Sequence, residues 1–184
     1  MHPLKRAGLF LFPLAAVLQL SAATPPVPGD KAPDFALADM QGKQVRLSEL
    51  TAVSPVVLVV LRGFPGYQCP YCTRQVQDFV SNAAQFARAA VSVVFVYPGP
   101  PDGLQGKAAE SAAGKQLPER FRMLLDPGYE FSNAWGLRWD APQETAWPST
   151  FVIDKGSVVF FAKVSKVHAG RTTAAEVLAA LAAR

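Results

Sequence analysis

An unbroken run of β-branched residues and leucines constrains the fold of this chain more than any other feature. Residues 56–61 read Val-Val-Leu-Val-Val-Leu and offer no polar position that could face solvent. Such a run is typical of a strand that is buried on both faces, as the strands of parallel sheets are. A glycine-free amphipathic stretch follows at 70–90, and a second apolar run follows at 91–97. This order predicts a βαβ unit with a right-handed parallel connection.

Shorter patterns on either side of this unit complete a single α/β domain. Residues 35–37 and 44–47 predict a small hairpin, and residues 150–153 and 158–163 predict a second one around an Asp-Lys-Gly-Ser turn. Thr173 opens a capping-box pattern, which predicts the start of a final helix. A chain of 184 residues, half of them hydrophobic, is long enough for one domain with a substantial core.

The N-terminus has the pattern of a secretory signal. Residues 1–23 combine a short positive end, an apolar run at 7–20 and a small-residue Ser-Ala-Ala end. The alternative is an uncleaved anchor, but this run spans roughly 21 Å at the rise of an α-helix, short of the ~30 Å hydrocarbon core of a bilayer. We therefore expect cleavage near Ala23 and a mature domain of residues 24–184. It should be periplasmic or secreted and should not span the membrane.

Charge and composition exclude several classes of function. The formal net charge is +4, and two of the positive charges, Lys5 and Arg6, lie in the segment that we expect to be removed. The remaining charge is too small to indicate a nucleic-acid partner. The chain has two cysteines and two histidines, and His2 lies in the segment that we expect to be removed. The three that remain are too few for a four-ligand zinc finger, and the histidines are too few for a centre built on several of them.

The reactive residues stand at the start of the amphipathic stretch, in the tetrad Cys-Pro-Tyr-Cys. The spacing puts the sulfurs of Cys69 and Cys72 on one helical face, and Pro70 suits the first helical position. Free backbone N–H groups and the helix dipole favour a thiolate at Cys69 and can lower a cysteine pKa from ~8.5 to between about 3.5 and 7.5. Cys72 is one turn inside and should keep a higher pKa. An exposed attacking sulfur with a recessed partner is typical of a redox-active dithiol.

Two other uses of the cysteines are less favoured. A structural disulfide that closes four residues should contribute only about 2 kcal/mol, against ~3 kcal/mol for a fifteen-residue loop. A structural zinc site would have two cysteines and the distant His168, which leaves the tetrahedron incomplete.

The order of segments resembles a known family. GDKAPDFAL, VVLVVLRG, CPYC, VVFVYPG, LLDPGYEFSNAWGL and PSTFVID look like the AhpC/TSA (peroxiredoxin-like) and redoxin group of the thioredoxin-like superfamily, over roughly residues 27–161. The tetrad is also that of glutaredoxins. The resemblance implies a thioredoxin-like fold, with a central mixed sheet flanked by helices. It also implies that Cys69 is the nucleophile, that Cys72 is the resolving thiol, and that their disulfide is the redox centre with no other cofactor.

Further site residues follow from the resemblance and from residue type. In thioredoxin-like reductases a cis proline shapes the substrate groove beside the attacking sulfur, and Pro148 resembles it. Trp147 and Tyr71 are candidates for the rim of that groove, with core packing as an equal alternative. Arg62 is a candidate for stabilising the Cys69 thiolate by its charge, the alternative being that its side chain points to solvent.

Departures from the family pattern bear on the reaction. Typical peroxiredoxins have a threonine three residues before the peroxidatic cysteine and a proline seven before, where this chain has Gly66 and Arg62. Their activating arginine precedes the (S/A)TF strand, where this chain has Pro148. Since the threonine and the arginine donate hydrogen bonds to the peroxide oxygens, their replacement favours another reaction. The preferred hypothesis is an exported thiol-disulfide oxidoreductase that acts on protein or small-molecule disulfides with an upstream dithiol electron donor.

Two alternatives stay open. The first is a thiol-dependent peroxidase, an antioxidant in which Cys69 is oxidised by a hydroperoxide and Cys72 condenses with it. The second is a copper-binding chaperone that uses both sulfurs and His168. The direction of electron flow depends on a reduction potential that the sequence does not give.

Overall fold

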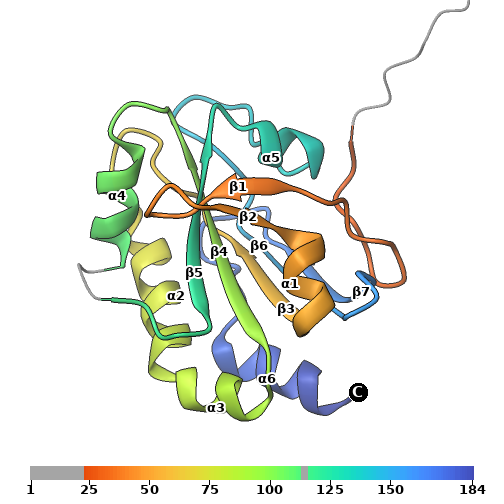
Figure 1. Ribbon diagram of the computed structural model, residues 1–184. Helices are drawn as coiled ribbons and strands as arrows, with labels where there is room; N and C mark the ends of the chain where they lie inside the picture. The colour runs from red at the N-terminus through yellow and green to blue at the C-terminus, as the bar shows by residue number, and fades with distance from the viewer. Residues whose placement is uncertain (1–22, 113–115) are drawn as a thin grey trace, which may run out of the picture.

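The computed structural model describes residues 23–112 and 116–184 (Figure 1). Nearly all of the expected signal segment, residues 1–22, lies outside the described residues. Across the two described ranges, no helix combines the length and the apolar character needed to cross a membrane.

A five-stranded mixed sheet forms the centre of the molecule. Its strand order is β5-β4-β3-β6-β7. The strands are β3 (Val56–Val60), β4 (Ser92–Gly99), β5 (Phe121–Pro127), β6 (Ser149–Ile153) and β7 (Val159–Val164). The strands β3, β4 and β5 run parallel, whereas β6 and β7 each pair antiparallel with their neighbours. Both the predicted βαβ unit and the predicted C-terminal hairpin are therefore confirmed.

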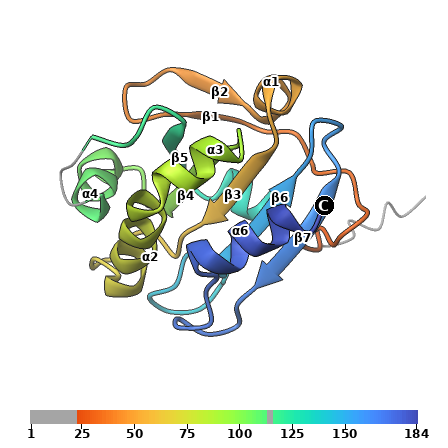
Figure 2. The same cartoon turned by 90° about the horizontal axis from the view of Figure 1, so that it is seen from below.

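Alternate residues of β3 divide the apolar core into two halves. Val57 and Val59 pack on one face of the sheet, and Val56, Leu58 and Val60 pack on the other. The first face is covered by α2 (Pro70–Ser81), α3 (Ala83–Arg88), α4 (Leu104–Ser111) and α6 (Ala174–Ala182) (Figure 2). The second is covered by α1 (Leu47–Val53), α5 (Glu130–Ala134) and the hairpin of β1 (Ala36–Ala38) and β2 (Gln44–Arg46). The continuous apolar run at 56–61 is explained by this burial on both sides.

The long helix predicted at 70–90 is two helices. Asn82 separates α2 from α3, and its side-chain amide donates to the carbonyl of Asp78 at 2.8 Å. Asparagine side chains compete in this way with the backbone hydrogen bonds of a helix. The predicted cap of the final helix is confirmed, since Thr173 Oγ1 accepts from the backbone N–H of Glu176 at 3.2 Å where α6 begins.

The packing of α2 on the sheet makes a prediction about stability. Phe79 of α2 is fully buried and stacks on Phe86 with ring centroids 5.3 Å apart. Phe79→Ala should lower the free energy of unfolding by about 3–5 kcal/mol, because it removes buried area and leaves a cavity. The measurement is urea-induced unfolding. Val53→Ala, at a position 75% exposed, is the control and should change it by less than about 0.5 kcal/mol. Equal losses in the two variants would contradict the assignment of Phe79 to the core.

Candidate active site

The loop after β3 delivers the cysteines to the start of α2. Gly63 has φ of +70°, and a Cβ there would lie 1.8 Å from the carbonyl oxygen of Pro98 at the end of β4. Only glycine permits this close approach. Cys69 is the N-cap residue of α2, and its carbonyl accepts from the backbone N–H of Cys72 at 2.9 Å. The sequence prediction for Cys69, Pro70 and Cys72 in the first turn is confirmed.

Both cysteines are buried free thiols. Cys69 is 2% exposed and Cys72 is fully buried. The expectation of an exposed attacking sulfur is therefore wrong. The reason is that Cys69 belongs to the apolar cluster that also holds Leu104 and Ala108 of α4. This helix begins 35 residues after Cys69, and its position against that residue could not be predicted from local patterns.

The two cysteines have opposite pKa shifts. A hydrogen bond from the Cys72 thiol, backbone N–H groups of Cys72 and Tyr71, and the charge of Arg171 together lower the pKa of Cys69 to about 5, against the opposing effect of burial. Burial raises the pKa of Cys72 well above its ordinary value, and its hydrogen bond to Cys69 raises it further. Cys69 is thus a thiolate at neutral pH while Cys72 keeps its proton. The directions are those expected from the sequence, but helix position is only part of the cause.

The cation beside Cys69 is Arg171, which sequence reasoning missed. Its Nη2 lies 3.7 Å from Cys69 Sγ, its Nη1 donates to Gln75 Oε1 at 3.0 Å, and its Nε donates to the carbonyl of His168 at 2.8 Å. Arg171 lies between β7 and α6, and 102 residues separate it from Cys69. No local motif connects positions so far apart. They come together because β6 pairs with β3, which precedes Cys69, and with β7, which precedes Arg171.

Arg62 is enclosed and paired with a carboxylate. It is 1% exposed, so it does not point to solvent. Its guanidinium donates to the carboxylate of Glu144, and Nη2 donates to the carbonyl of Gln143 at 2.5 Å. The guanidinium carbon lies 4.9 Å from the ring centre of Tyr67. The charge of Arg62 is thus paired with Glu144, and a direct effect of Arg62 on the Cys69 thiolate stays a prediction.

The prediction of a cis bond before Pro148 is also wrong. Among the described residues no peptide bond is cis, and Pro148 is buried with its carbonyl accepting from the backbone N–H of Ser165 at 2.8 Å. Trans is the commoner isomer of any X-Pro bond. Here the trans bond is compatible with the hydrogen bond between Ser165 and Pro148. Trp147 stacks on Trp139 with ring centroids 3.8 Å apart, and Tyr71 is 37% exposed beside the cysteines. A substrate groove formed by these residues stays a prediction.

The copper alternative lacks its third ligand. His168 Nε2 lies 2.9 Å from Glu144 Oε1 and is engaged there. Within residues 23–112 and 116–184, no three His, Cys, Asp or Glu side chains are grouped so that they could hold a metal ion.

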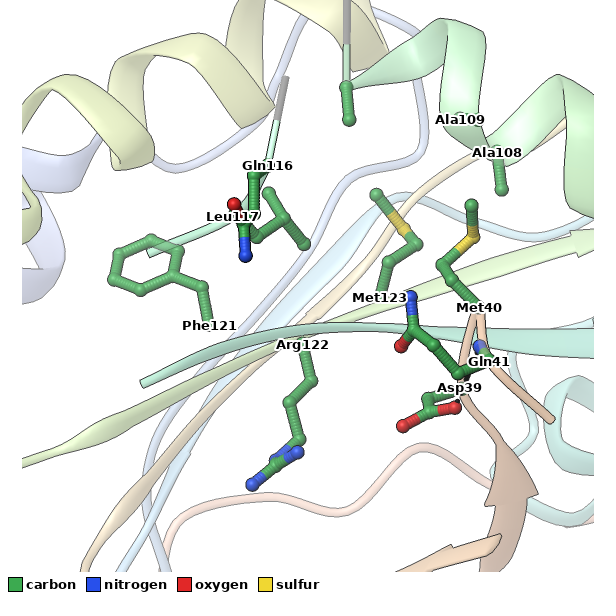
Figure 3. A pocket seen from close by; sticks show the side chains of 11 residues that line it. Asp39, Met40, Gln41, Ala108, Ala109, Gln116, Leu117, Phe121, Arg122 and Met123 are labelled. Carbon is green, nitrogen blue, oxygen red and sulfur yellow. Dashed lines mark hydrogen bonds between the residues drawn. The ribbon is translucent and has the colours of Figure 1, made fainter. Parts of the chain in front are cut away.

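A separate pocket of about 630 Å³ lies between the β1–β2 connection, α4 and β5 (Figure 3). Met40 and Met123 both point toward α4, while Arg122 points to the other side of β5. Neither cysteine lines this pocket, so it is not the reaction centre. Its lining residues are Asp39, Met40, Gln41, Ala108, Ala109, Ala112, Gln116, Leu117, Phe121, Arg122 and Met123.

The hydrogen bond between the two thiols makes a prediction about the pKa of Cys69. Cys72→Ala removes the donor that lowers this pKa most, so the midpoint should rise from about 5 by roughly one unit or more. Cys72→Ser keeps a hydroxyl donor and should retain most of the lowering. The measurement is the ultraviolet absorbance of the thiolate as a function of pH. If both variants titrate like the unaltered protein, the hydrogen bond from Cys72 does not set the pKa.

The sequence and the fold of this chain are similar to those of known proteins. The sequence profile of the AhpC/TSA family matches residues 28–161. Peroxiredoxin Q of Sedum lineare chloroplasts is 30% identical over 162 residues, which cover 86% of this chain and 81% of that protein. The crystal structure of peroxidoxin BcpB from Mycobacterium tuberculosis is 26% identical, with a TM-score of 0.67 over 85% of this chain and 96% of that one. Reduced Prx3 of Vibrio vulnificus, solved in complex with hydrogen peroxide, is 23% identical, and its TM-score of 0.69 over 85% of this chain and 99% of that one shows the fold alone. The thioredoxin-like fold is thus confirmed, and the chain belongs to the AhpC/TSA family.

Proposed function

We propose that this protein is a thiol peroxidase of the peroxiredoxin type, in which Cys69 reduces a hydroperoxide and Cys72 resolves the product. The observation that carries the proposal is the guanidinium of Arg171 against the buried sulfur of Cys69. The sequence favoured disulfide reduction because Pro148 stands where an activating arginine is usual. Arg171 supplies a guanidinium to the same sulfur from another part of the chain, and the peroxiredoxins among the relatives support the same reaction.

The oxidative step needs a thiolate and a donor. The Cys69 thiolate attacks one oxygen of ROOH, the O–O bond breaks, and the sulfur becomes a sulfenic acid (Cys69–SOH). The other oxygen leaves as an alkoxide, or as hydroxide from hydrogen peroxide, and takes up a proton to give ROH or water. Negative charge moves from sulfur to the leaving oxygen, and a guanidinium next to the sulfur stabilises that charge.

The resolving step follows from the position of Cys72. The Cys72 sulfur attacks Cys69–SOH, the S–S bond forms, and the hydroxide leaves as water with the proton of the Cys72 thiol. The negative Cys69 sulfur is one reason for the raised pKa of Cys72. Since the sulfenic acid is neutral, that effect is absent when Cys72 has to react. An external dithiol then returns two electrons to the disulfide.

Burial of Cys69 favours a small substrate. With 2% of the residue exposed, a protein disulfide cannot bring a sulfur in line with Cys69 Sγ unless the covering segments move. Hydrogen peroxide and small organic hydroperoxides need far less room. We therefore propose these as the substrates, and we propose from the pattern of residues 1–23 that the protein works outside the cytoplasm.

A second candidate is the thiol-disulfide oxidoreductase that the sequence favoured. The observation on its side is that Gly66 and Arg62 stand where typical peroxiredoxins have threonine and proline. Both candidates use the Cys69–Cys72 disulfide, so they differ in the oxidant and not in the redox centre.

The proposed cycle predicts different products in two cysteine variants. After one equivalent of hydrogen peroxide, the reduced protein should lose two hydrogens in mass as the Cys69–Cys72 disulfide forms. Cys72→Ser should stop at a sulfenic acid that dimedone labels, and Cys69→Ser should not react. Mass spectrometry is the measurement. If hydrogen peroxide oxidised the Cys69→Ser variant, another residue would be the nucleophile.

The two candidate substrates predict opposite rate comparisons. The reduced protein should consume hydrogen peroxide with a second-order rate constant at least about a hundredfold above that of free cysteine at the same pH. The reason is that one donor that stabilises charge in a transition state accelerates a reaction by about 10²–10³-fold. It should reduce insulin disulfides no faster than free cysteine. A protein that reduces insulin quickly and consumes peroxide only at the rate of free cysteine would be the disulfide oxidoreductase instead.

A further inference from the structure

A second group of charged side chains lies close to the reaction centre without touching either sulfur. The carboxylate of Glu144 joins two partners: Oε2 accepts from Nε of Arg62, and Oε1 lies 2.9 Å from Nε2 of His168. Arg62 and Glu144 are almost completely enclosed, with side chains 1% and 11% exposed. The proposed peroxidase cycle gives this group no part.

The group is connected to Arg171 through the backbone of His168. The carbonyl of His168 accepts from Nε of Arg171 at 2.8 Å, and Nη2 of the same guanidinium reaches Cys69 Sγ. Fixing the imidazole of His168 therefore fixes the turn that orients Arg171. The contacts run in an unbroken series from Arg62, at the end of β3, to Cys69, at the start of α2.

A second support holds the other side of the guanidinium. Gln75 of α2 accepts from Nη1 at 3.0 Å, and its own amide donates to the carbonyl of Thr172 at 3.1 Å. Arg171 is thus clamped between α2 and the turn at 165–170. If the turn at 165–170 shifted and its carbonyl moved away, Gln75 alone would support a long side chain that is in part exposed to solvent.

The energetics of a buried pair explain why such a group could act as a rigid support. Arg62 cannot leave Glu144 without exposing an uncompensated charge to an apolar interior, which is strongly unfavourable. Both oxygens of Glu144 are occupied, so its carboxylate has one orientation. His168, 37% exposed at its side chain, is the member that can be altered without opening the buried pair.

We propose that Arg62, Glu144 and His168 are positioning residues that hold the guanidinium of Arg171 against Cys69. The proposal rests on the proposed function, because the sulfur that Arg171 contacts is the one that would attack the peroxide. It also assigns a role to the arginine seven residues before Cys69.

A double-mutant cycle tests this role. Arg171→Met should raise the pKa of Cys69 by about one unit, which lowers the thiolate fraction about tenfold below that pKa. His168→Ala should raise the pKa of Cys69 by about half a unit, which lowers the thiolate fraction roughly threefold. Because His168 acts through Arg171, the double variant should match Arg171→Met alone. Thiolate absorbance against pH and the rate with hydrogen peroxide are the two measurements.

Two further variants separate positioning from general damage. His168→Gln places an amide N–H near the position of Nε2 and should restore most of the lowered pKa. Val167→Ala changes a side chain that is 58% exposed on the same turn and should leave the pKa and the rate unchanged. Glu144→Gln should act like His168→Ala if it folds, and its circular dichroism and unfolding midpoint show whether it does.

The outcomes distinguish this proposal from the proposed function. If His168→Ala leaves the pKa of Cys69 unchanged while Arg171→Met raises it, or if the two effects add, the positioning role is wrong and the peroxidase proposal is unaffected. If the unaltered protein does not react with hydrogen peroxide faster than free cysteine, the proposed function fails. The titration still reports whether His168 positions Arg171.

Discussion

The chemistry of this protein depends on keeping a negative sulfur inside an apolar core. Burial alone would raise the pKa of Cys69 and leave it an unreactive thiol. Three kinds of donor reverse that effect here: the thiol of Cys72, the backbone N–H groups at the start of α2, and the guanidinium of Arg171. The charge is stabilised by contacts within the protein, so the site can be closed to solvent and still reactive.

The fold brings these donors together from distant parts of the chain. Strand β3 is fixed by apolar packing on both faces, and it ends where the loop to Cys69 begins. Gly63 lets that loop pass against Pro98 at the end of β4. The antiparallel hairpin of β6 and β7 leads to the segment between β7 and α6 (Figure 1). Arg171 lies in that segment. A stable core is therefore the condition for a site whose parts are joined by contacts of only a few ångströms.

The sequence predicted what depends on neighbouring residues. The apolar run at 56–61, the Thr173 cap and the Cys69–Cys72 spacing each specify structure within a turn or a strand, and the structure has all three. Arg171, the enclosed position of Arg62 and the burial of Cys69 depend on which segments the folded chain places side by side. They could not be found from local patterns. The trans bond before Pro148 is a different case, since the general preference of X-Pro bonds predicts it and the cis expectation came from the resemblance alone.

Family membership and site geometry agree on a thiol-based oxidation, and the buried, guanidinium-paired Cys69 favours a small hydroperoxide as the oxidant. The most direct test is the second-order rate constant of the reduced protein with hydrogen peroxide, measured from about pH 4 to about pH 8. It should rise with a midpoint near 5, because the thiolate is the reacting form, and be constant at neutral pH. A rate that still climbs at the upper end of this range, as an ordinary thiol with a pKa of ~8.5 would show, would contradict a stabilised thiolate at Cys69.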